Sequence, residues 1–487
     1  MRSVICALLV ILACDMAARR RAVRTLPAAT WNAALTATAT GHVTIAGKSI
    51  ASSTRLHATW TAPGTIDHYV LIATETAGGP PLTFTASTSP FDLTNLESGT
   101  EYRISIRACL DAACVSSINS DASTVATTAE EYWQIRGSGS SFSTAERLVS
   151  DGNTKPFAIR WDNGTTQLYY DPNVAGEKGI KIATSSDPLT GFTPISGFGF
   201  RRGDAVGRMG IGPATFQVVP LTTRLGGQTR MFWEAAGTDQ RARIYSRDSV
   251  DGWTGRDFHS GASTICLETD LAAGGACAAE MLIGTQGDAV NGNPKIQQAR
   301  QFKLGLPLLD SSTWDETPGT FMIVTGHLSD PACSATFFNA TYAVWNGTQW
   351  NVQYAPNGCP KLIAAVQAPM PVHVGGTRYK LYFNHNRESN GLGGHKPLKL
   401  LYADGAATGD ALLVEFEDWE TADRMRELRV LWPSGVELTD VEKSQFDDYQ
   451  VWMPTRDPAL QVMYSNMTCP NNACGAPFIG SALLVNP

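Results

Sequence analysis

The sequence predicts an all-β protein. Short runs of alternating apolar and polar residues recur along the chain, whereas long stretches with the 3.6-residue period of a helix are scarce. The chain contains 45 glycines and 26 prolines, residue types that end strands and form the turns between them. Its 487 residues are too many for one ordinary core, so we expect two or three domains.

The composition is typical of a folded, soluble protein, with 43% hydrophobic and 17% charged residues. The formal net charge is −7, and no stripe of basic residues follows the chain. Nucleic acid is therefore not expected as a partner. No motif indicates a cofactor, and none is predicted.

The N-terminal residues, "MRSVICALLVILACDMAARRR", are typical of an export signal. Arg2 precedes an apolar run over 3–13 that is too short to span a membrane comfortably. The end of this run, "ILAC", resembles the lipobox of bacterial lipoproteins, which implies a lipidated Cys14 and attachment to the cell envelope. The alternative is an ordinary signal peptide and a secreted protein. We assign 1–14 to the signal and 15–40, rich in Ala, Thr and Arg, to a linker; membrane contact is expected only through the anchor.

Cysteine usage also indicates export. Apart from Cys6 and Cys14, the cysteines fall into pairs that are close in the sequence, and such pairs form disulfides in oxidising compartments. The predicted disulfides join Cys109 to Cys114, Cys266 to Cys277, Cys333 to Cys359 and Cys469 to Cys474. A zinc site is the weaker interpretation, because C-x-x-C is absent and the histidines lack zinc-ligand spacing. No metal is predicted.

From residue 41 the runs "RLHATWTAPG", "DHYVLIATE" and "LTNLESGTEYRISIRA" read as strands of a small β-sandwich. The segment 41–129 resembles a fibronectin type III domain. In that resemblance Trp60 and Tyr69 are the core aromatics of the second and third strands. Tyr102 is the corner tyrosine, whose hydroxyl group returns to nearby backbone. The resemblance implies a spacer or adhesive module.

From Glu130 onward a unit recurs: a strand, a polar turn, a strand with aromatic residues, a second turn and a third strand. Its clearest copies begin at "KPFAIRW", "GPATFQVV", "APMPVHV" and "DDYQVW", with aromatic positions at Tyr170, Trp233, Tyr382 and Tyr464. The wide interval before the third copy must hold a divergent copy, with "TFMIVTGHL" and "ATYAVWNGTQWNVQ" as strands. Five such units predict a five-bladed β-propeller over 130–487. "YWQIRG" is expected to close the ring against the last blade.

Two short helical turns are predicted between blades. "STAERL" and "LTDVEKSQF" each begin with a capping box, in which a Ser or Thr side chain and a Glu three residues later satisfy each other's backbone N–H groups. The boxes pair Ser143 with Glu146 and Thr439 with Glu442.

The propeller pattern resembles that of arabinanase-like and levansucrase-like glycoside hydrolases, in which ligands bind in the mouth. The mouth is the face where the first strand of each blade starts and the second strand ends. The resemblance implies that Trp233, Asn384 and His385 are candidates for ligand binding. The expected partner is a glycan or another cell-surface ligand.

Glycosidases need two carboxyl groups across the scissile bond. The candidates are Asp171, just after the second strand of the first copy, Glu234 in the equivalent place, and Asp448 at the start of the last copy. In the related enzymes an acid often stands at the start of the first strand, before proline. Here these places are held by Lys155, Gly212 and Ala368. Asp171-Pro172-Asn173 also reads as a plain turn. We therefore predict a binding mouth without catalysis, with a glycoside hydrolase of divergent acid set as the alternative.

Overall fold

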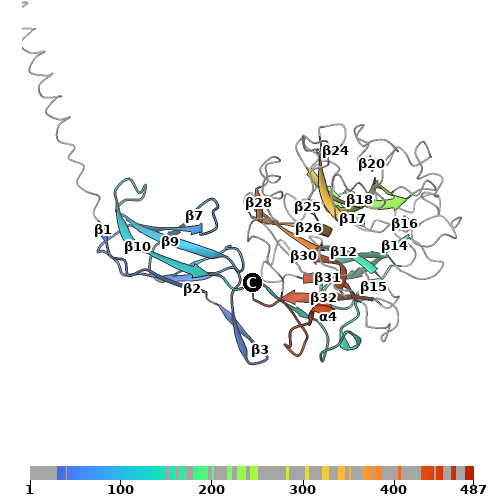
Figure 1. Cartoon of the computed structure of the whole chain (residues 1–487), viewed down its shortest axis with the longest axis horizontal. Helices are drawn as coiled ribbons and strands as arrows, with labels where there is room; N and C mark the ends of the chain where they lie inside the picture. Colours follow the sequence, from blue (N-terminus) through green and yellow to red (C-terminus); the bar gives the residue numbers. More distant parts are fainter. Residues whose placement is uncertain are drawn as a thin grey trace, which may run out of the picture. The chain divides into compact units, whose positions relative to one another are not determined.

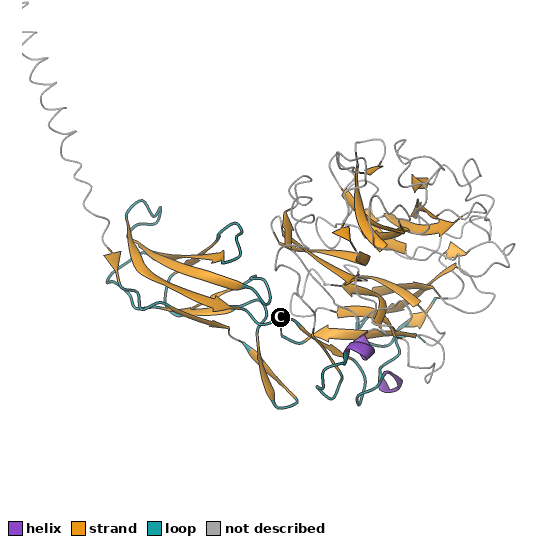
Figure 2. Ribbon diagram, viewed as in Figure 1, coloured by secondary structure: helices purple, strands orange, loops and turns teal. Residues whose placement is uncertain are grey.

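The computed structural model describes residues 30–39, 41–149, 154–160, 164–171, 179–195, 200–201, 216–221, 228–236, 242–249, 281–284, 302–305, 321–327, 338–345, 350–352, 363–364, 366–375, 378–385, 404–406, 429–443, 446–452, 462–467 and 478–486. The chain forms two compact units. One reaches to Val43 and includes Ile50–Ala129, and the other comprises Thr44–Ser49 and Glu130–Pro487. Strands make up nearly all regular structure in both units, so the predicted all-β class is confirmed (Figure 2).

The first unit contains two sheets that share one core (Figure 1). One sheet has the strand order β1-β10-β9-β6-β7 and the other β2-β5-β8, while β3 and β4 form a separate hairpin whose residues Thr44–Ser49 group with the second unit. The strands are β1 (Thr30–Trp31), β2 (Thr36–Ala39), β3 (His42–Ile45), β4 (Lys48–Ala51), β5 (Leu56–Thr59), β6 (His68–Glu75), β7 (Leu82–Ala86), β8 (Phe91–Leu93), β9 (Glu101–Cys109) and β10 (Ser117–Thr127). This arrangement is the predicted β-sandwich.

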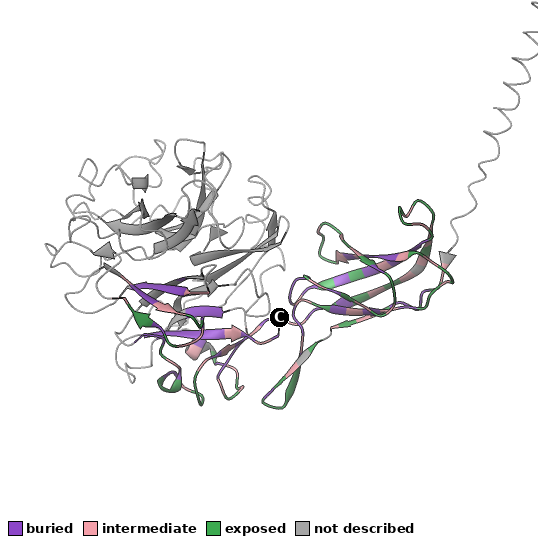
Figure 3. Cartoon of the chain, turned by 180° about the vertical axis from the view of Figure 1, so that it is seen from behind, coloured by how far each residue is buried: buried purple, intermediate pink, exposed green. Residues whose placement is uncertain are grey.

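Alternation along the strands builds the sandwich core. In β9 the residues Tyr102, Ile104 and Ile106 are buried, and the residues between them are more exposed. The buried positions of the sandwich strands are purple in Figure 3, between positions that are pink or green. Trp60 and Tyr69, the predicted core aromatics, meet edge to face with ring centroids 4.9 Å apart. Aromatic pairs in this geometry add stability beyond the area that they bury.

Tyr102 forms the predicted corner. Its side chain is 0% exposed, and its hydroxyl oxygen accepts the backbone N–H of Glu97 at 2.9 Å. The carbonyl of Glu97 in turn accepts the hydroxyl of Thr128, which follows the last strand. The Tyr102 hydroxyl thus returns to nearby backbone, as the resemblance implied, and the turn before β9 is tied to the start of β9 and to the end of β10.

Residues 30–39, which we had assigned to the linker, are part of the sandwich. Thr36–Ala39 pairs with β5, and Thr30–Trp31 pairs in parallel with β10. Ala33 and Leu35, in the connection between these strands, are buried in the core. The linker assignment was wrong here because an Ala/Thr run carries little hydrophobic pattern, and backbone pairing with distant strands makes it a strand.

The second unit contains five sheets among the described residues. The first consists of β12 (Thr154–Arg160), β13 (Thr166–Asp171), β14 (Gly179–Ser185), β15 (Thr193–Pro194) and β16 (Phe200–Arg201). The second consists of β17 (Phe216–Leu221), β18 (Gln228–Ala236), β19 (Ala242–Ser249) and β20 (Met281–Gly284). The third consists of β21 (Phe302–Gly305), β22 (Phe321–His327), β23 (Phe338–Trp345), β24 (Trp350–Val352) and β25 (Ile363–Ala364), and it contains both strands predicted for the divergent copy.

The fourth sheet consists of β26 (Val366–Gly375), β27 (Arg378–His385) and β28 (Asp404–Ala406). The fifth has the order β29-β11-β32-β31-β30, with β29 (Arg429–Leu431), β11 (Tyr132–Ile135), β32 (Phe478–Leu484), β31 (Val462–Met467) and β30 (Phe446–Trp452). The strands β12, β17, β21, β26 and β30, one from each sheet, are neighbours in this order, and β30 returns to β12. Five sheets around one axis make the predicted five-bladed propeller.

The ring closes through strands from both ends of the unit. The predicted closing segment forms β11, which pairs antiparallel with β32 and parallel with β29. Trp133 in β11 lies opposite Leu484 and Val430 and is 0% exposed. The prediction that this segment closes the ring is confirmed.

A charged cluster lies beside the closure. The guanidinium of Arg429 donates two hydrogen bonds of 2.5 Å to Glu437 and one of 3.0 Å to Glu130. The ammonium of Lys443 lies 3.6 Å from the same Glu437 carboxylate. Burial, the largest influence, raises the pKa of Glu437, but the hydrogen bonds and charge of Arg429 together with Lys443 outweigh it, so the pKa is lowered.

One of the two predicted capping boxes is present. Before α4 (Asp440–Lys443) the Thr439 N–H donates to Glu442 at 2.8 Å, and the Glu442 N–H donates to the Thr439 hydroxyl at 3.3 Å. The prediction of a capping box at Ser143 was wrong. A 3₁₀ turn, η1 (Phe142–Thr144), begins one residue earlier, and no side chain caps it. No helix in the described part of the chain is long and apolar enough to cross a membrane.

Candidate functional site

The first strands of three blades carry the same β-bulge close to their starts. In β12 the residue pairs are Thr154 with Asp171 and then Phe157 with Tyr169, so two residues of β12 oppose one of β13. The same two-against-one register recurs between β26 and β27 and between β30 and β31. The bulged pairs are Lys155-Pro156, Ala368-Pro369 and Asp448-Tyr449.

The bulges define one rim of the propeller. Because β26 lies beside β30 and β30 beside β12, the three bulged blades follow one another around the ring. Lys155, Ala368 and Asp448 hold equivalent places as the first bulged residue. Bulges are common at the rims of β structures and beside active sites, where they redirect a side chain. Among these three places the only carboxylate belongs to Asp448.

The second strands of the same blades carry polar residues at this rim. Asp171 is the last residue of β13, opposite Thr154. Asn384 lies opposite Gln367, and His385, which ends β27, lies opposite Val366. Asn466 lies opposite Asp447 in the last blade, and sequence reasoning missed it. In the strand register Asn466 holds the same position as Asp171 and Asn384. The sequence did not reveal this match, because different residues follow each of the three.

Glu234 and Trp233 lie within β18 in the second blade. Trp233 pairs with Phe216, the first residue of β17, and Glu234 pairs with Ile244 of β19. Both residues are therefore near the rim end of their sheet. Asp171 is the final residue of its strand rather than the first after it, whereas Glu234 is followed by two further strand residues.

The register also corrects the alignment of aromatic residues. Tyr169, not Tyr170, matches Tyr382 and Tyr464, because each of the three sits two residues before the rim residue of its second strand. Tyr169, Tyr170 and Tyr464 are all 0% exposed. Tyr170 and Tyr464 pack in one cluster, where the Tyr464 hydroxyl donates to the Pro188 carbonyl at 2.7 Å. Tyr170 and Tyr464 therefore help to join the first and last blades, and none of the three tyrosines is exposed to a ligand.

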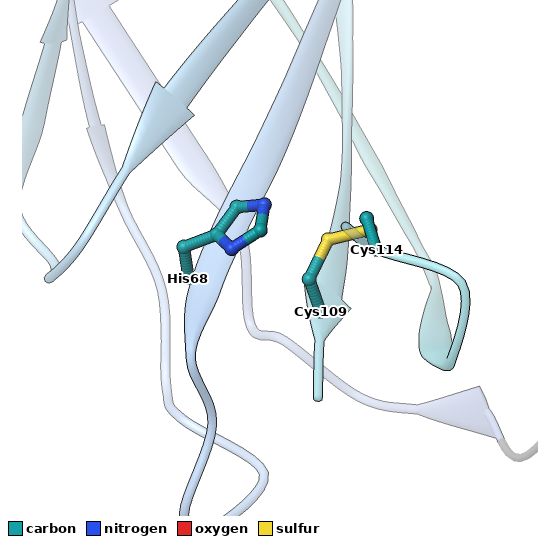
Figure 4. A group of neighbouring side chains, drawn as sticks. All are labelled: His68, Cys109 and Cys114. Carbon is teal, nitrogen blue, oxygen red and sulfur yellow. A yellow bond between two sulfur atoms is a disulfide. The ribbon is translucent and has the colours of Figure 1, made fainter. Parts of the chain in front are cut away.

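A second group of chemically reactive side chains lies in the first unit. The sulfur atoms of Cys109 and Cys114 are at disulfide-bonding distance, with Cα atoms 4.8 Å apart (Figure 4). The ring of His68, on the neighbouring strand β6, faces this pair. Donor atoms of the three residues all lie within 4.8 Å of one another. The other predicted disulfide cysteines and Cys14 lie outside the described residues, so those pairings and the lipidation stay predictions.

Comparisons with known proteins concern both units. No curated protein sequence matches the chain. Among solved structures, the FN3 domain of human collagen XX is similar, with 20% identity over 20% of this chain and 96% of that one, at a TM-score of 0.15. The GH43_1 enzyme from Xanthomonas citri is 12% identical over 69% of this chain and 89% of its own, at 0.37.

The α-L-arabinofuranosidase Arb93A from Fusarium graminearum is 11% identical over 73% of this chain and 97% of its own, at a TM-score of 0.37. The family model for the fibronectin type III domain matches residues 43–114. This match agrees with the buried Trp60 and Tyr69 and with the Tyr102 corner. The first unit is therefore a fibronectin type III domain, followed in this all-β chain by a five-bladed propeller.

Proposed function

We propose that the bulged rim of the propeller is the mouth of a glycan-binding site. The observation that carries this proposal is the repetition of one rim design in three consecutive blades. Each has a bulge near the start of its first strand and, on its second strand, a polar residue paired with the residue just before the bulge. The polar residues are Asp171, Asn384 and Asn466. Carboxylates and side-chain amides offer the acceptors and donors that sugar hydroxyl groups need.

The rim favours binding over hydrolysis because its bulge positions are poor in acids. A glycosidase needs one protonated and one ionised carboxyl group, about 5–10 Å apart. Lys155 and Ala368 remove the carboxylate from two of the three equivalent places. This leaves Asp448 to act with an acid from another position, such as Asp171 or Glu234.

A glycoside hydrolase is the second candidate function, and one observation favours it. Asp448 lies on β30 and Asp171 lies on β13. Both strands are neighbours of β12, so the two acids come from adjacent blades at the same rim. Two acids on neighbouring blades are the minimum set for acid and base or nucleophile roles.

The test uses the full chain and a panel of oligosaccharides. Binding is measured by calorimetry for the wild type, Asp171→Asn and Glu234→Gln, and sugar release is measured by a reducing-end assay. Asp187→Asn is the matched control, because it makes the same change in the same blade. Asp187 lies just after β14. The last residue of β14, Ser185, pairs with Thr166 at the start of β13, so Asp187 is at the end of the blade away from the rim.

We expect the two rim variants to weaken binding several-fold, the control to match the wild type, and no sugar to be released. Rim variants that bind like the control would overturn the proposed mouth. Sugar release by the wild type that Asp448→Asn abolishes would establish the hydrolase instead.

We further propose that the protein is exported and anchored to the cell envelope through Cys14. The support is the N-terminal sequence, in which a short apolar run ends at this cysteine. Cys14→Ser should then move the protein from the membrane fraction to the soluble fraction. Mass spectrometry of the wild type should find an acylated cysteine as its first residue, whereas a mature chain starting well beyond Cys14 would exclude the anchor.

A further inference from the structure

Strand pairing in the fibronectin type III domain places a histidine beside the sulfur atoms of Cys109 and Cys114. His68 in β6 lies directly opposite Cys109 in β9. The backbone N–H of Asp67 donates to the Cys109 carbonyl at 2.9 Å, which holds the start of β6 against the end of β9. The His68 ring therefore faces the sulfur atoms because of the register of two central strands of the sheet (Figure 4).

The orientation of the imidazole is set by a carboxylate. Nδ1 of His68 lies 2.8 Å from Oδ1 of Asp67, so Nδ1 is the nitrogen that carries hydrogen toward the carboxylate. In the neutral imidazole Nε2 then has the lone pair that a metal ion needs. A histidine that holds a metal ion almost always has such a carboxylate or carbonyl partner on its other nitrogen.

The loop that carries Cys114 is held by hydrogen bonds that do not involve sulfur. The carboxylate of Asp111 accepts the N–H groups of Ser116 at 2.7 Å, Val115 at 3.0 Å and Ala113 at 3.1 Å. The Leu110 N–H also donates to the Ser116 carbonyl at 2.8 Å. The loop should keep its shape when the disulfide is opened.

We propose that the dithiol form of this domain binds a thiophilic divalent cation of the zinc class through Cys109, Cys114 and Nε2 of His68. Zinc lies about 2.3 Å from thiolate sulfur and about 2.0 Å from imidazole nitrogen, so donors around one ion are about 3.5–4 Å apart. Here the two sulfur atoms and a ring nitrogen of His68 lie within 4.8 Å of one another, and the two cysteines flank one short loop. Three protein donors leave the fourth tetrahedral position to water.

The disulfide and the metal exclude each other, which makes the site dependent on redox state. A thiol reductant opens the disulfide by exchange: the two cysteines gain two electrons and two protons, and two reductant molecules leave joined as their own disulfide. Binding of a divalent ion then releases the two thiol protons, because thiolates are the ligands. The reverse exchange, in which a small-molecule disulfide is reduced to two thiols, re-forms the bond between Cys109 and Cys114 and expels the ion.

The experiment uses the full chain, reduced with a phosphine and titrated anaerobically with Co²⁺ and then with Zn²⁺. The phosphine opens each disulfide with one water molecule, giving two thiols and the phosphine oxide. Thiolate-to-cobalt absorption reports sulfur ligation, and competition with a chromogenic chelator gives the zinc affinity. The variants are Cys114→Ser, His68→Asn and Asp67→Asn. His57→Asn is the matched control, because its Nδ1 also lies 2.7 Å from a carboxylate, that of Asp92, but away from the cysteines.

The reduced wild type should bind one more equivalent of metal ion than Cys114→Ser. The ions that Cys114→Ser still binds measure the contribution of the other cysteines. His68→Asn and Asp67→Asn should each weaken this equivalent by about 10–100-fold, as loss of a ligand or its hydrogen-bonding partner does. Reduced His57→Asn should bind the metal ion with the same affinity as the reduced wild type. The oxidised wild type should lack the additional equivalent of bound metal ion. Asp67→Asn keeps the proposal testable if other variants misfold, because the Asp67 side chain is half exposed.

Two results would overturn the proposal. One is an equal number of bound ions in the reduced wild type and Cys114→Ser, with both folded by circular dichroism. The other is an affinity that neither His68→Asn nor Asp67→Asn changes, which would mean that histidine is not a ligand.

Discussion

Truncating Trp133 should open the propeller at its closure. The residue lies in β11 and is 0% exposed, and its indole N–H donates to the Glu131 carboxylate at 3.2 Å. A buried aromatic side chain covers about 150–250 Å², which at about 25 cal/mol per Å² gives about 4–6 kcal/mol as an upper bound. Truncations of buried aromatic residues cost about 3–5 kcal/mol. We therefore expect Trp133→Ala to destabilise the closure by about 4 kcal/mol.

Hydrogen exchange on the full chain locates this loss. A change of about 4 kcal/mol corresponds to about 1,000-fold faster exchange of amides that exchange by opening of the closure. The affected amides are those of β11 and β32, which pair with each other, while β9 in the other unit is the internal reference. Trp133→Phe keeps most of the ring and should cost less. The reasoning is refuted if Trp133→Ala leaves exchange in β32 within about threefold of the wild type.

Other predictions concern the sandwich, the charged cluster and the cysteines. Tyr102→Phe removes the acceptor of the buried Glu97 N–H and should cost the first unit about 1–3 kcal/mol in urea unfolding; no loss would mean that the corner is dispensable. Glu437→Gln should cost about 1 kcal/mol at neutral pH, a value reduced by solvent screening. Because the folded pKa of Glu437 is lowered, its contribution is complete above its ordinary value of 4.5 and is lost as pH falls through the folded pKa. A difference between Glu437→Gln and the wild type that persists in acid would contradict this assignment. Non-reducing peptide mapping should find the four local cysteine pairs, and any link between different pairs contradicts them.

Local pattern in the sequence determined most of the architecture. Strands that alternate strongly, such as β9, carry a signal in their own residues, because one face must be apolar and the other polar. The corner at Tyr102 and the capping box at Thr439 join groups only a few residues apart, so their sequence spacing specifies the bond. The repeat of similar units predicted the blades, since a single meander cannot bury both of its faces.

Only the tertiary structure decided the features that depend on pairing between distant residues. The weakly patterned segment Thr36–Ala39 became a strand because β5 supplies its hydrogen-bond partners. The repeat in the sequence already aligned Asp448 with Lys155, but the bulge that both share is a matter of register, which no single strand contains. His68 meets Cys109 across two strands that are far apart in the chain, so no spacing rule could identify the group. Sequence periodicity reports which face of a strand is buried, whereas the choice of partner and register is made by hydrogen bonds between strands.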